Sequence, residues 1–493
     1  MTGWWTIGVL VAYAVLLTAW SRLFARKSDN PTFFIGERRS NWLLVAFGMI
    51  GASVSGVSFI SVPGWVEQTH MTYLQMCLGF VPGYLIVAYV LLPLYWRIGQ
   101  PSIYAFLRGR FGQMSHRTGS LFFVASKLVG ASARLYVVVL VLHEMVFRPL
   151  GCSFILTAVT TLLLIWLYTH RSGIRALVYT DVLQTAFMLA AIGALLYAAA
   201  HTLGLDARGL WRVATQHEMS EVFRWSGMQS FWRQFFSGIF IVIVMTGLDQ
   251  DMMQKNLSCR SLRAAQKDMC TYGLGFLPVN FVLLLLGILL YMVCSQQGLN
   301  PPEPSDRLLP FLVGGGHLGA WVIVPFALGI MASAFSSADS ALTALTTTTC
   351  IDLLSMPTRQ WDEWKQIRIR RIVHAGVVLM CLLCTIVFRA VNSGNAIHAI
   401  YVLASYTYGP LLGLFAFGLF TRRSVRDWLV PAVCIMAPVA CGLLDHYSPV
   451  WWNYRFGYEL LMLNGAITFM GLWMLSLGQG RTDILSQSDR NNR

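Results

Sequence analysis

A cluster of hydroxyl-bearing residues lies in an apolar stretch between about residues 320 and 348. Ser333, Ser336 and Ser337 recur at helical spacing and therefore share one face of a helix. Neutral oxygens on one face can replace the water shell of a small, hard cation, and polar groups inside a membrane are costly enough to indicate a function. The pattern predicts a sodium site. The alternative is that these hydroxyls bond to their own helix or allow two helices to pack closely.

A second stretch, residues 48–64, has a composition that disfavours a continuous helix. Four glycines, four serines and a proline interrupt its apolar residues. An unwound helix at this place would offer backbone carbonyls to an ion, as in transporters built from inverted repeats. The segment 246–251, at the end of the apolar stretch 231–250, has similar features. Close glycine packing without a break is the alternative for residues 48–64.

These two stretches belong to a chain that is too apolar for a soluble globular protein. Of its 493 residues, 56% are hydrophobic and 12% are charged, and its mean hydropathy is +0.59. We therefore expect an all-α polytopic membrane protein with about thirteen transmembrane helices. The predicted spans are 5–21, 42–65, 73–96, 119–146, 152–169, 176–201, 231–250, 271–294, 320–348, 373–390, 396–420, 427–444 and 457–477.

The distribution of basic residues predicts the orientation. Most of the 36 lysines and arginines lie in the loops that follow the odd-numbered spans. The positive-inside rule assigns these loops to the cytoplasmic side. We expect an external N-terminus and a cytoplasmic C-terminus, in the inner membrane of a bacterium. The net charge of +14 then reflects topology, so no nucleic-acid partner is expected.

Other classes of protein lack the residues they would need. A membrane-embedded enzyme requires a convergent set of nucleophile, base or metal ligands, and the ten histidines show no paired-ligand spacing. The ten cysteines lie mostly within predicted spans and are expected to pack as small apolar residues. A sensor would need an appended signalling domain, and none is expected from the sequence. We predict a transporter and no enzyme.

Five motifs occur in the same order as in the sodium/solute symporter family, which the chain resembles over nearly its whole length. They are Ser58–Ser61, Gly173–Gln184 with Tyr179-Thr180-Asp181, Asp249-Gln250 followed by Gln254-Lys255, Ser336-Ser337 followed by Asp352, and Tyr408–Phe415 followed by Arg422-Arg423. The resemblance implies a leucine-transporter-like fold with broken helices and inverted five-helix repeats. The expected units are a first helix and loop (1–41), a first repeat (42–201), a second repeat (230–420), two further helices (427–477) and a cytoplasmic tail (478–493).

The resemblance also implies the ligands of the coupling ion. The family's conserved sodium site maps onto carbonyl and hydroxyl oxygens of Gly51, Val54, Ser333, Ser336 and Ser337. Some members bind a second sodium ion near an aspartate that matches Asp181, so either one or two ions are expected here. Asp181 would then lie on the exit route of the ion. The alternative is an ordinary charge at the cytoplasmic start of a helix.

Side chains that line the solute pocket in the family match five polar residues here, namely Ser53, Ser55, Ser58, Gln75 and Thr246. The asparagine and aromatic pair of the sugar carriers are replaced by Val242, Val244 and Met245, which argues against a sugar bound in that mode.

Lys127 and Arg134 introduce two cations into one apolar span. Arg134 could meet the carboxylate of an anionic solute. The alternatives are that Lys127 reaches the inner interface and that Arg134 forms a structural pair.

These observations predict a sodium-coupled symporter that imports a small polar organic solute by alternating access. Sodium, the solute and the lipid bilayer are its expected partners, and it is expected to function as a monomer. A proton-driven or sodium-independent carrier of the same fold is one alternative. Sodium-coupled uptake of a small organic anion, rather than a neutral solute, is another.

Overall fold

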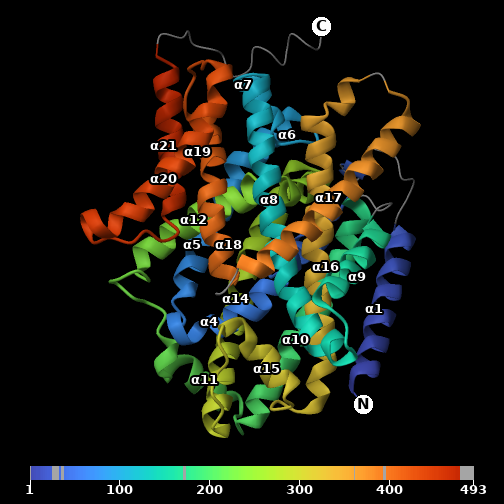
Figure 1. The fold of residues 1–493 in the computed structure, drawn as a ribbon. Coiled ribbons are helices and arrows are strands. Elements are labelled where there is room, and N and C mark those ends of the chain that lie inside the picture. The colour runs from blue at the N-terminus through green and yellow to red at the C-terminus, as the bar shows by residue number, and fades with distance from the viewer. Residues whose placement is uncertain are drawn as a thin grey trace.

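The computed structural model describes residues 2–24, 33–34, 38–169, 174–359, 361–391 and 396–477, and these residues form helices and no strands (Figure 1). The predicted tail 478–493 lies outside the described residues. The helices are α1 Thr2–Phe24, α3 Trp42–Ser53, α4 Gly56–Thr69, α5 Tyr73–Ile86, α6 Leu92–Ile98, α7 Ala105–Arg110, α8 Gln113–Leu142, α9 Phe154–Thr169, α10 Ile174–Thr202, α11 Ala207–Gln216, α12 Phe231–Val242, α13 Gln250–Leu257, α14 Leu262–Gln297, α15 Leu308–Gly314, α16 Ile323–Thr348, α17 Glu363–Val391, α18 Ala396–Thr407, α19 Gly409–Phe420, α20 Val430–Trp452 and α21 Leu460–Leu475.

The predicted all-α membrane architecture is confirmed. Within the described part of the chain, seven helices are long and apolar enough to cross a bilayer, three pairs of helices are bent spans, and three further apolar helices are shorter. Each of the predicted spans coincides with one of these. The last-but-one span is longer than predicted, because α20 continues past residue 444, through Pro449, to Trp452. Membrane helices tolerate internal prolines when neighbours satisfy the freed backbone groups.

The first bent pair confirms the predicted break in the second span. The axes of α3 and α4 differ by 54°, and the residues between them, Val54 and Ser55, are not helical. Gly51 allows α3 to reach α10, because a Cβ atom at this residue would lie 1.9 Å from the hydroxyl of Thr185. The small residues of this segment therefore allow close helix packing and also accompany a break in the helix. The sequence had left these two explanations as alternatives.

The second bent pair, α12 and α13, differs in direction by 65°. A π-helical turn, Ile243–Gly247, ends α12, and Asp249 begins α13 by accepting a hydrogen bond from the backbone N–H of Asp251 at 2.9 Å. The two breaks occupy corresponding places in the two predicted five-span units. The third bent pair, α18 and α19, bends by 47° at Tyr408.

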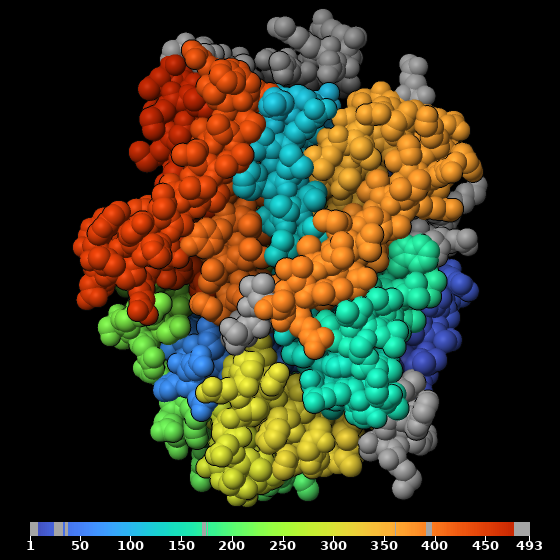
Figure 2. Space-filling model, viewed as in Figure 1, coloured from blue at the N-terminus to red at the C-terminus, as the bar shows by residue number. Residues whose placement is uncertain are grey.

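The helices differ in how much of their surface they bury. In the most apolar parts of α14 and α16, 67% of the residues are buried, whereas the figure is 17% in α17 and 22% in α20. Figure 1 shows α8 and α16 passing through the middle of the molecule, α1 at one edge and α20 projecting at the other. In Figure 2 the surface of α8 (cyan) runs between the helices near the C-terminus (red) and α17. The central helices therefore carry the residues that a transport site would use.

Two short helices lie between the predicted spans. The segments 203–229 and 296–319 contain α11 and α15, and both helices lie at the lower end of the molecule in Figure 1. Asp206 caps α11 by accepting a hydrogen bond from the backbone N–H of Gly209 at 2.6 Å.

Candidate functional site

The serine face of α16 meets the break between α3 and α4. The hydroxyl of Ser333 donates a hydrogen bond to the carbonyl of Val54 at 3.3 Å, and the hydroxyl of Ser337 donates to the carbonyl of Ala52 at the same distance. Both serines are buried. The predicted meeting of hydroxyls and freed carbonyls is therefore present, with the carbonyl of Ala52 added to the set that the sequence suggested.

Ser336 points to a different partner. Its hydroxyl donates a hydrogen bond to Oδ1 of Asp181 at 2.6 Å, while Oδ2 of Asp181 lies 2.8 Å from the ammonium of Lys255. Asp181 lies inside α10 and is buried rather than placed at the start of the helix. The alternative that it caps a helix end is therefore wrong, and its charge is balanced by a lysine of α13.

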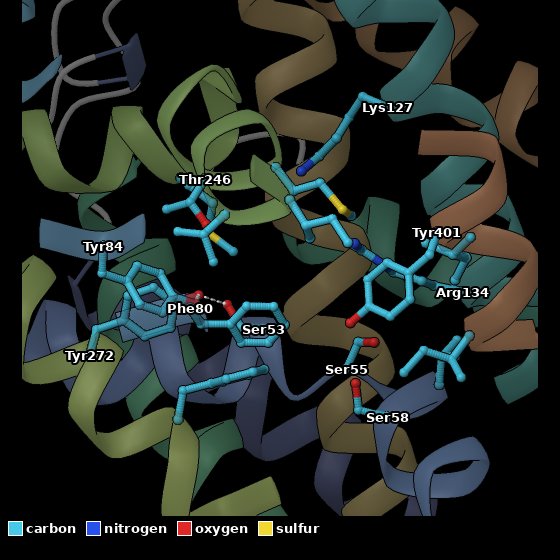
Figure 3. A pocket seen from close by; sticks show the side chains of 18 residues that line it. Ser53, Ser55, Ser58, Phe80, Tyr84, Lys127, Arg134, Thr246, Tyr272 and Tyr401 are labelled. Carbon is cyan, nitrogen blue, oxygen red and sulfur yellow. Dashed lines mark hydrogen bonds between the residues drawn. The ribbon is translucent and has the colours of Figure 1, made fainter. Parts of the chain in front are cut away.

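A cavity lies between the α3–α4 break, α8, the end of α12, α14 and α18 (Figure 3). Five of the residues predicted to bind the solute line it: Ser53, Ser55, Ser58, Thr246 and Arg134. They come from spans far apart in the sequence.

The two ends of the cavity differ in chemistry (Figure 3). At one end, the hydroxyl of Ser53 lies 2.5 Å from that of Tyr272, which also accepts a hydrogen bond from Tyr84 at 2.9 Å. At the other end, Arg134, Lys127 and Tyr401 face the cavity. A solute with one anionic group and one uncharged polar group fits this arrangement.

The two cations at the second end have different environments. The Lys127 ammonium lies 3.0 Å from a carboxylate oxygen of Asp249 and 2.8 Å from one of Asp251, and all three side chains are buried. The alternative that Lys127 reaches the membrane interface is therefore wrong. Arg134 is half-buried, and among the residues that the structure describes its guanidinium forms no hydrogen bond or ion pair.

Gln75 is the one predicted solute residue that does not line the cavity. Its amide nitrogen donates to the carbonyl of Gln229 at 2.9 Å, and its amide oxygen accepts from the backbone N–H of Arg224 at 3.1 Å. These bonds fasten the segment before α12 to the start of α5. A polar residue at the end of an apolar span is equally compatible with a loop contact and with a ligand contact, so the sequence could not separate the two.

The sequence assigned no role to Lys255 or Asp251, although both belong to a motif that it contains. Their spacing of four residues indicates a pair on one helix face, but the Lys255 ammonium lies closer to Asp181 than to Asp251, whose nearest oxygen is at 4.0 Å. Asp339 of α16 is a further buried carboxylate, and it accepts a hydrogen bond from Tyr168 at 2.8 Å.

Comparison with known proteins gives consistent matches. The model of the sodium:solute symporter family matches residues 33–427. The sodium-dependent multivitamin transporter of Oryctolagus cuniculus is 26% identical over 412 residues, covering 78% of this chain and 61% of that protein. The human sodium/iodide cotransporter is 24% identical over 438 residues, covering 85% and 66%. The chain thus spans less than two thirds of the length of these two relatives. A sodium/sialic acid symporter, NanT of Aliivibrio fischeri, is 23% identical over 430 residues, covering 84% and 83%.

Solved structures match the fold. A substrate-bound, outward-open Na⁺-coupled sialic acid symporter superposes with a TM-score of 0.84 at 17% identity, covering 97% of this chain and 99% of that one. The nucleobase-cation-symport-1 family transporter Mhp1, in a closed conformation with bromovinylhydantoin bound, gives a TM-score of 0.60 at 13% identity, covering 95% and 98%. These similarities confirm the predicted leucine-transporter-like fold.

Proposed function

The chain belongs to the sodium:solute symporter family. On this basis, we propose that it is a sodium-coupled secondary active symporter, which imports a small organic anion by alternating access. The expectation of a transporter rather than an enzyme is confirmed by this membership, as is that of an integral, multi-pass membrane protein. The coupling, the solute and the residues that bind it belong to the proposal.

The environment of Arg134 is the main observation that supports an anionic solute. A guanidinium at mid-depth in a membrane protein costs several kcal/mol when nothing balances its charge. Among the described residues no carboxylate lies within ion-pair distance of Arg134, and Asp251, whose charge acts on Arg134 from farther away, already pairs with Lys127. A carboxylate of the solute would supply that balance through a bidentate contact. Relatives of this chain are named for iodide, sialic acid and monocarboxylates, which supports an anion.

Sodium fits the oxygens where α16 meets the break. The carbonyls of Ala52 and Val54 and the hydroxyls of Ser333 and Ser337 are all neutral, and such a set suits a monovalent cation, whereas calcium usually takes several carboxylates. Gly51 remains a predicted ligand of the same ion. Ser336, which the family resemblance implies as a ligand, directs its hydroxyl to Asp181 instead, so we leave it out of the proposed set.

Coupling follows from the shared break. Ser53 and Ser55 line the solute cavity, and Val54 between them offers its carbonyl to the serine face of α16. An ion that fixes this backbone also fixes the two cavity serines, so each ligand lowers the ordering cost for the other. Binding of sodium and solute is then reciprocal.

The test is uptake by the purified protein in liposomes, with an inward gradient of sodium or of choline. The probes are N-acetylneuraminate, lactate and biotin, with glucose and proline as solutes without net charge. We expect sodium-dependent uptake of at least one anion and none of the neutral solutes. Uptake driven by a proton gradient without sodium would contradict the coupling, and sodium-dependent uptake of neutral solutes alone would contradict the solute class.

The charge distribution supports an external N-terminus and a cytoplasmic C-terminus in a bacterial inner membrane. Labelling of single cysteines introduced at Trp225 and Lys365 with a membrane-impermeant maleimide tests this orientation in intact cells, on a background without reactive native cysteines. The position at Trp225 in the external loop should label, and the position at Lys365 in the first turn of α17 should not.

A further inference from the structure

Asp181 has both of its carboxylate oxygens engaged by the protein. Oδ1 accepts a hydrogen bond from Ser336 at 2.6 Å, and Oδ2 lies 2.8 Å from the ammonium of Lys255. The side chains of Asp181 and Lys255 are each 1% exposed. A sodium ion at this carboxylate would have to displace one of these two groups.

Among the described residues, Asp181 is the carboxylate nearest to the Lys255 ammonium, and Asp268 and Asp339 act on it only from beyond ion-pair distance. The next carboxylate along its own helix, Asp251, has an oxygen 4.0 Å away, but Asp251 already pairs with Lys127 at 2.8 Å. A buried ammonium that lost Asp181 would therefore lose most of its compensation, which is strongly unfavourable in a low-dielectric interior.

The serine face of α16 is divided accordingly. Ser333 and Ser337 contact the carbonyls of the α3–α4 break, and Ser336 contacts the Asp181–Lys255 pair. Neutral oxygens are thus available to a cation on one side of the helix face. On the other side a cation belonging to the protein is already present, and a second cation beside it would be repelled.

We propose that the ammonium of Lys255 is a fixed cation that takes the position a second sodium ion would need at Asp181, so that this chain carries one sodium ion per solute. Asp181 matches the aspartate near which some family members bind a second sodium ion. In this chain, however, its surroundings do not fit a second sodium ion. The inference rests on the proposed sodium-coupled transport. It also implies that symport of a monovalent anion with one sodium ion moves no net charge.

The first test is the sodium stoichiometry of the wild-type protein. Radioactive sodium alone is titrated onto the purified protein in nanodiscs, and bound ions are counted per chain. We expect one ion and a Hill coefficient of about one. Two bound ions would overturn the inference while leaving sodium coupling intact, whereas no specific binding would refute the proposed function itself.

Variants of Lys255 supply the second test. In Lys255→Met the carboxylate of Asp181 loses its cation, and we expect a second bound sodium ion and a Hill coefficient that rises toward two. Lys255→Arg keeps the charge and should bind one ion. The double variant Asp181→Asn/Lys255→Met removes both charges and should also bind one.

A folded Lys255→Met protein that binds a single ion would contradict the role of Lys255. Folding is checked by monodispersity in size-exclusion chromatography. If Lys255→Met does not fold, the numbers of sodium ions bound to the wild type, to Lys255→Arg and to the double variant test the inference. Two ions bound to any of these three proteins would overturn it.

Discussion

The two broken helices solve the same structural problem in different ways. At the break between α3 and α4, the freed carbonyls of Ala52 and Val54 meet only hydroxyls, at 3.3 Å. At the break between α12 and α13, Asp249 and Asp251 meet the ammonium of Lys127 at 2.8–3.0 Å. Tyrosine hydroxyls also donate hydrogen bonds to carbonyls at this second break, those of Gly247 and Leu248, at 2.8 and 2.7 Å. What distinguishes the second break is therefore its buried charges.

The difference teaches which break can exchange a ligand. Hydroxyl-to-carbonyl contacts of 3.3 Å are long for O–H···O hydrogen bonds, so little is lost when an ion replaces them. A buried ion pair that loses one partner is strongly destabilised. The neutral break is therefore suited to binding and releasing sodium, and the charged break is suited to holding α8 and α13 together throughout the cycle.

The largest expected effect comes from removing the lysine at the charged break. Lys127→Met leaves two carboxylates buried without their cation, which should cost about 3–5 kcal/mol. We expect a large fall in the thermal unfolding temperature of the purified protein, followed by intrinsic fluorescence. Arg148→Met, at the exposed pair with Glu144, is the matched control and should cost no more than about 1 kcal/mol. Equal destabilisation by both variants would contradict the contrast between the breaks.

A smaller effect is expected at the cationic end of the cavity. Arg134→Gln removes the charge but keeps hydrogen-bonding capacity, and a charged hydrogen bond is worth about 1.5–3 kcal/mol. The concentration of the transported anion at half-maximal uptake should rise about tenfold or more, with sodium binding unchanged. Arg148→Gln, an exposed arginine on the extension of the same span, serves as the control. Unchanged anion affinity would make Arg134 a structural residue.

Serines at the neutral break should have a moderate effect. Ser333→Ala and Ser337→Ala each remove one oxygen that could face the ion, at a cost of about 1 kcal/mol. The sodium concentration for half-maximal uptake should rise about fivefold in each variant. Ser132→Ala is the control, because Ser132 bonds to carbonyls of α8 and α17 and lies away from the break. Unaltered sodium dependence in the Ser333→Ala/Ser337→Ala double variant would show that sodium binds elsewhere.

The smallest effect is expected for Ser336→Ala. Because the Ser336 hydroxyl is directed to Asp181 rather than to the break, the half-saturating sodium concentration should change by less than about twofold, which corresponds to less than about 0.5 kcal/mol. The same uptake assay measures it beside Ser337→Ala. An effect as large as that of Ser337→Ala would place Ser336 among the sodium ligands, as the family resemblance implies.

Part of the site was predictable because its signals are local. The spacing of Ser333 and Ser337 alone shows that they share a helix face. The glycines and serines of residues 48–64 indicate a break in their span, whichever helices pack against it. Gln75 was assigned to the solute pocket by the family resemblance, yet its amide fastens a loop. A local pattern shows that a polar group is present in a span, but not which way it is used.

The sequence by itself determined the helices, because a backbone in lipid must satisfy its hydrogen bonds within each helix, and about twenty apolar residues are needed to cross the bilayer. It also determined the two breaks and the face of hydroxyls. Tertiary structure alone decided the partners of the buried charges. Lys127 pairs with Asp249, 122 residues away, and Lys255 pairs with Asp181 rather than with its neighbour on α13. Such choices depend on which helices pack together, and no spacing along one helix contains that information.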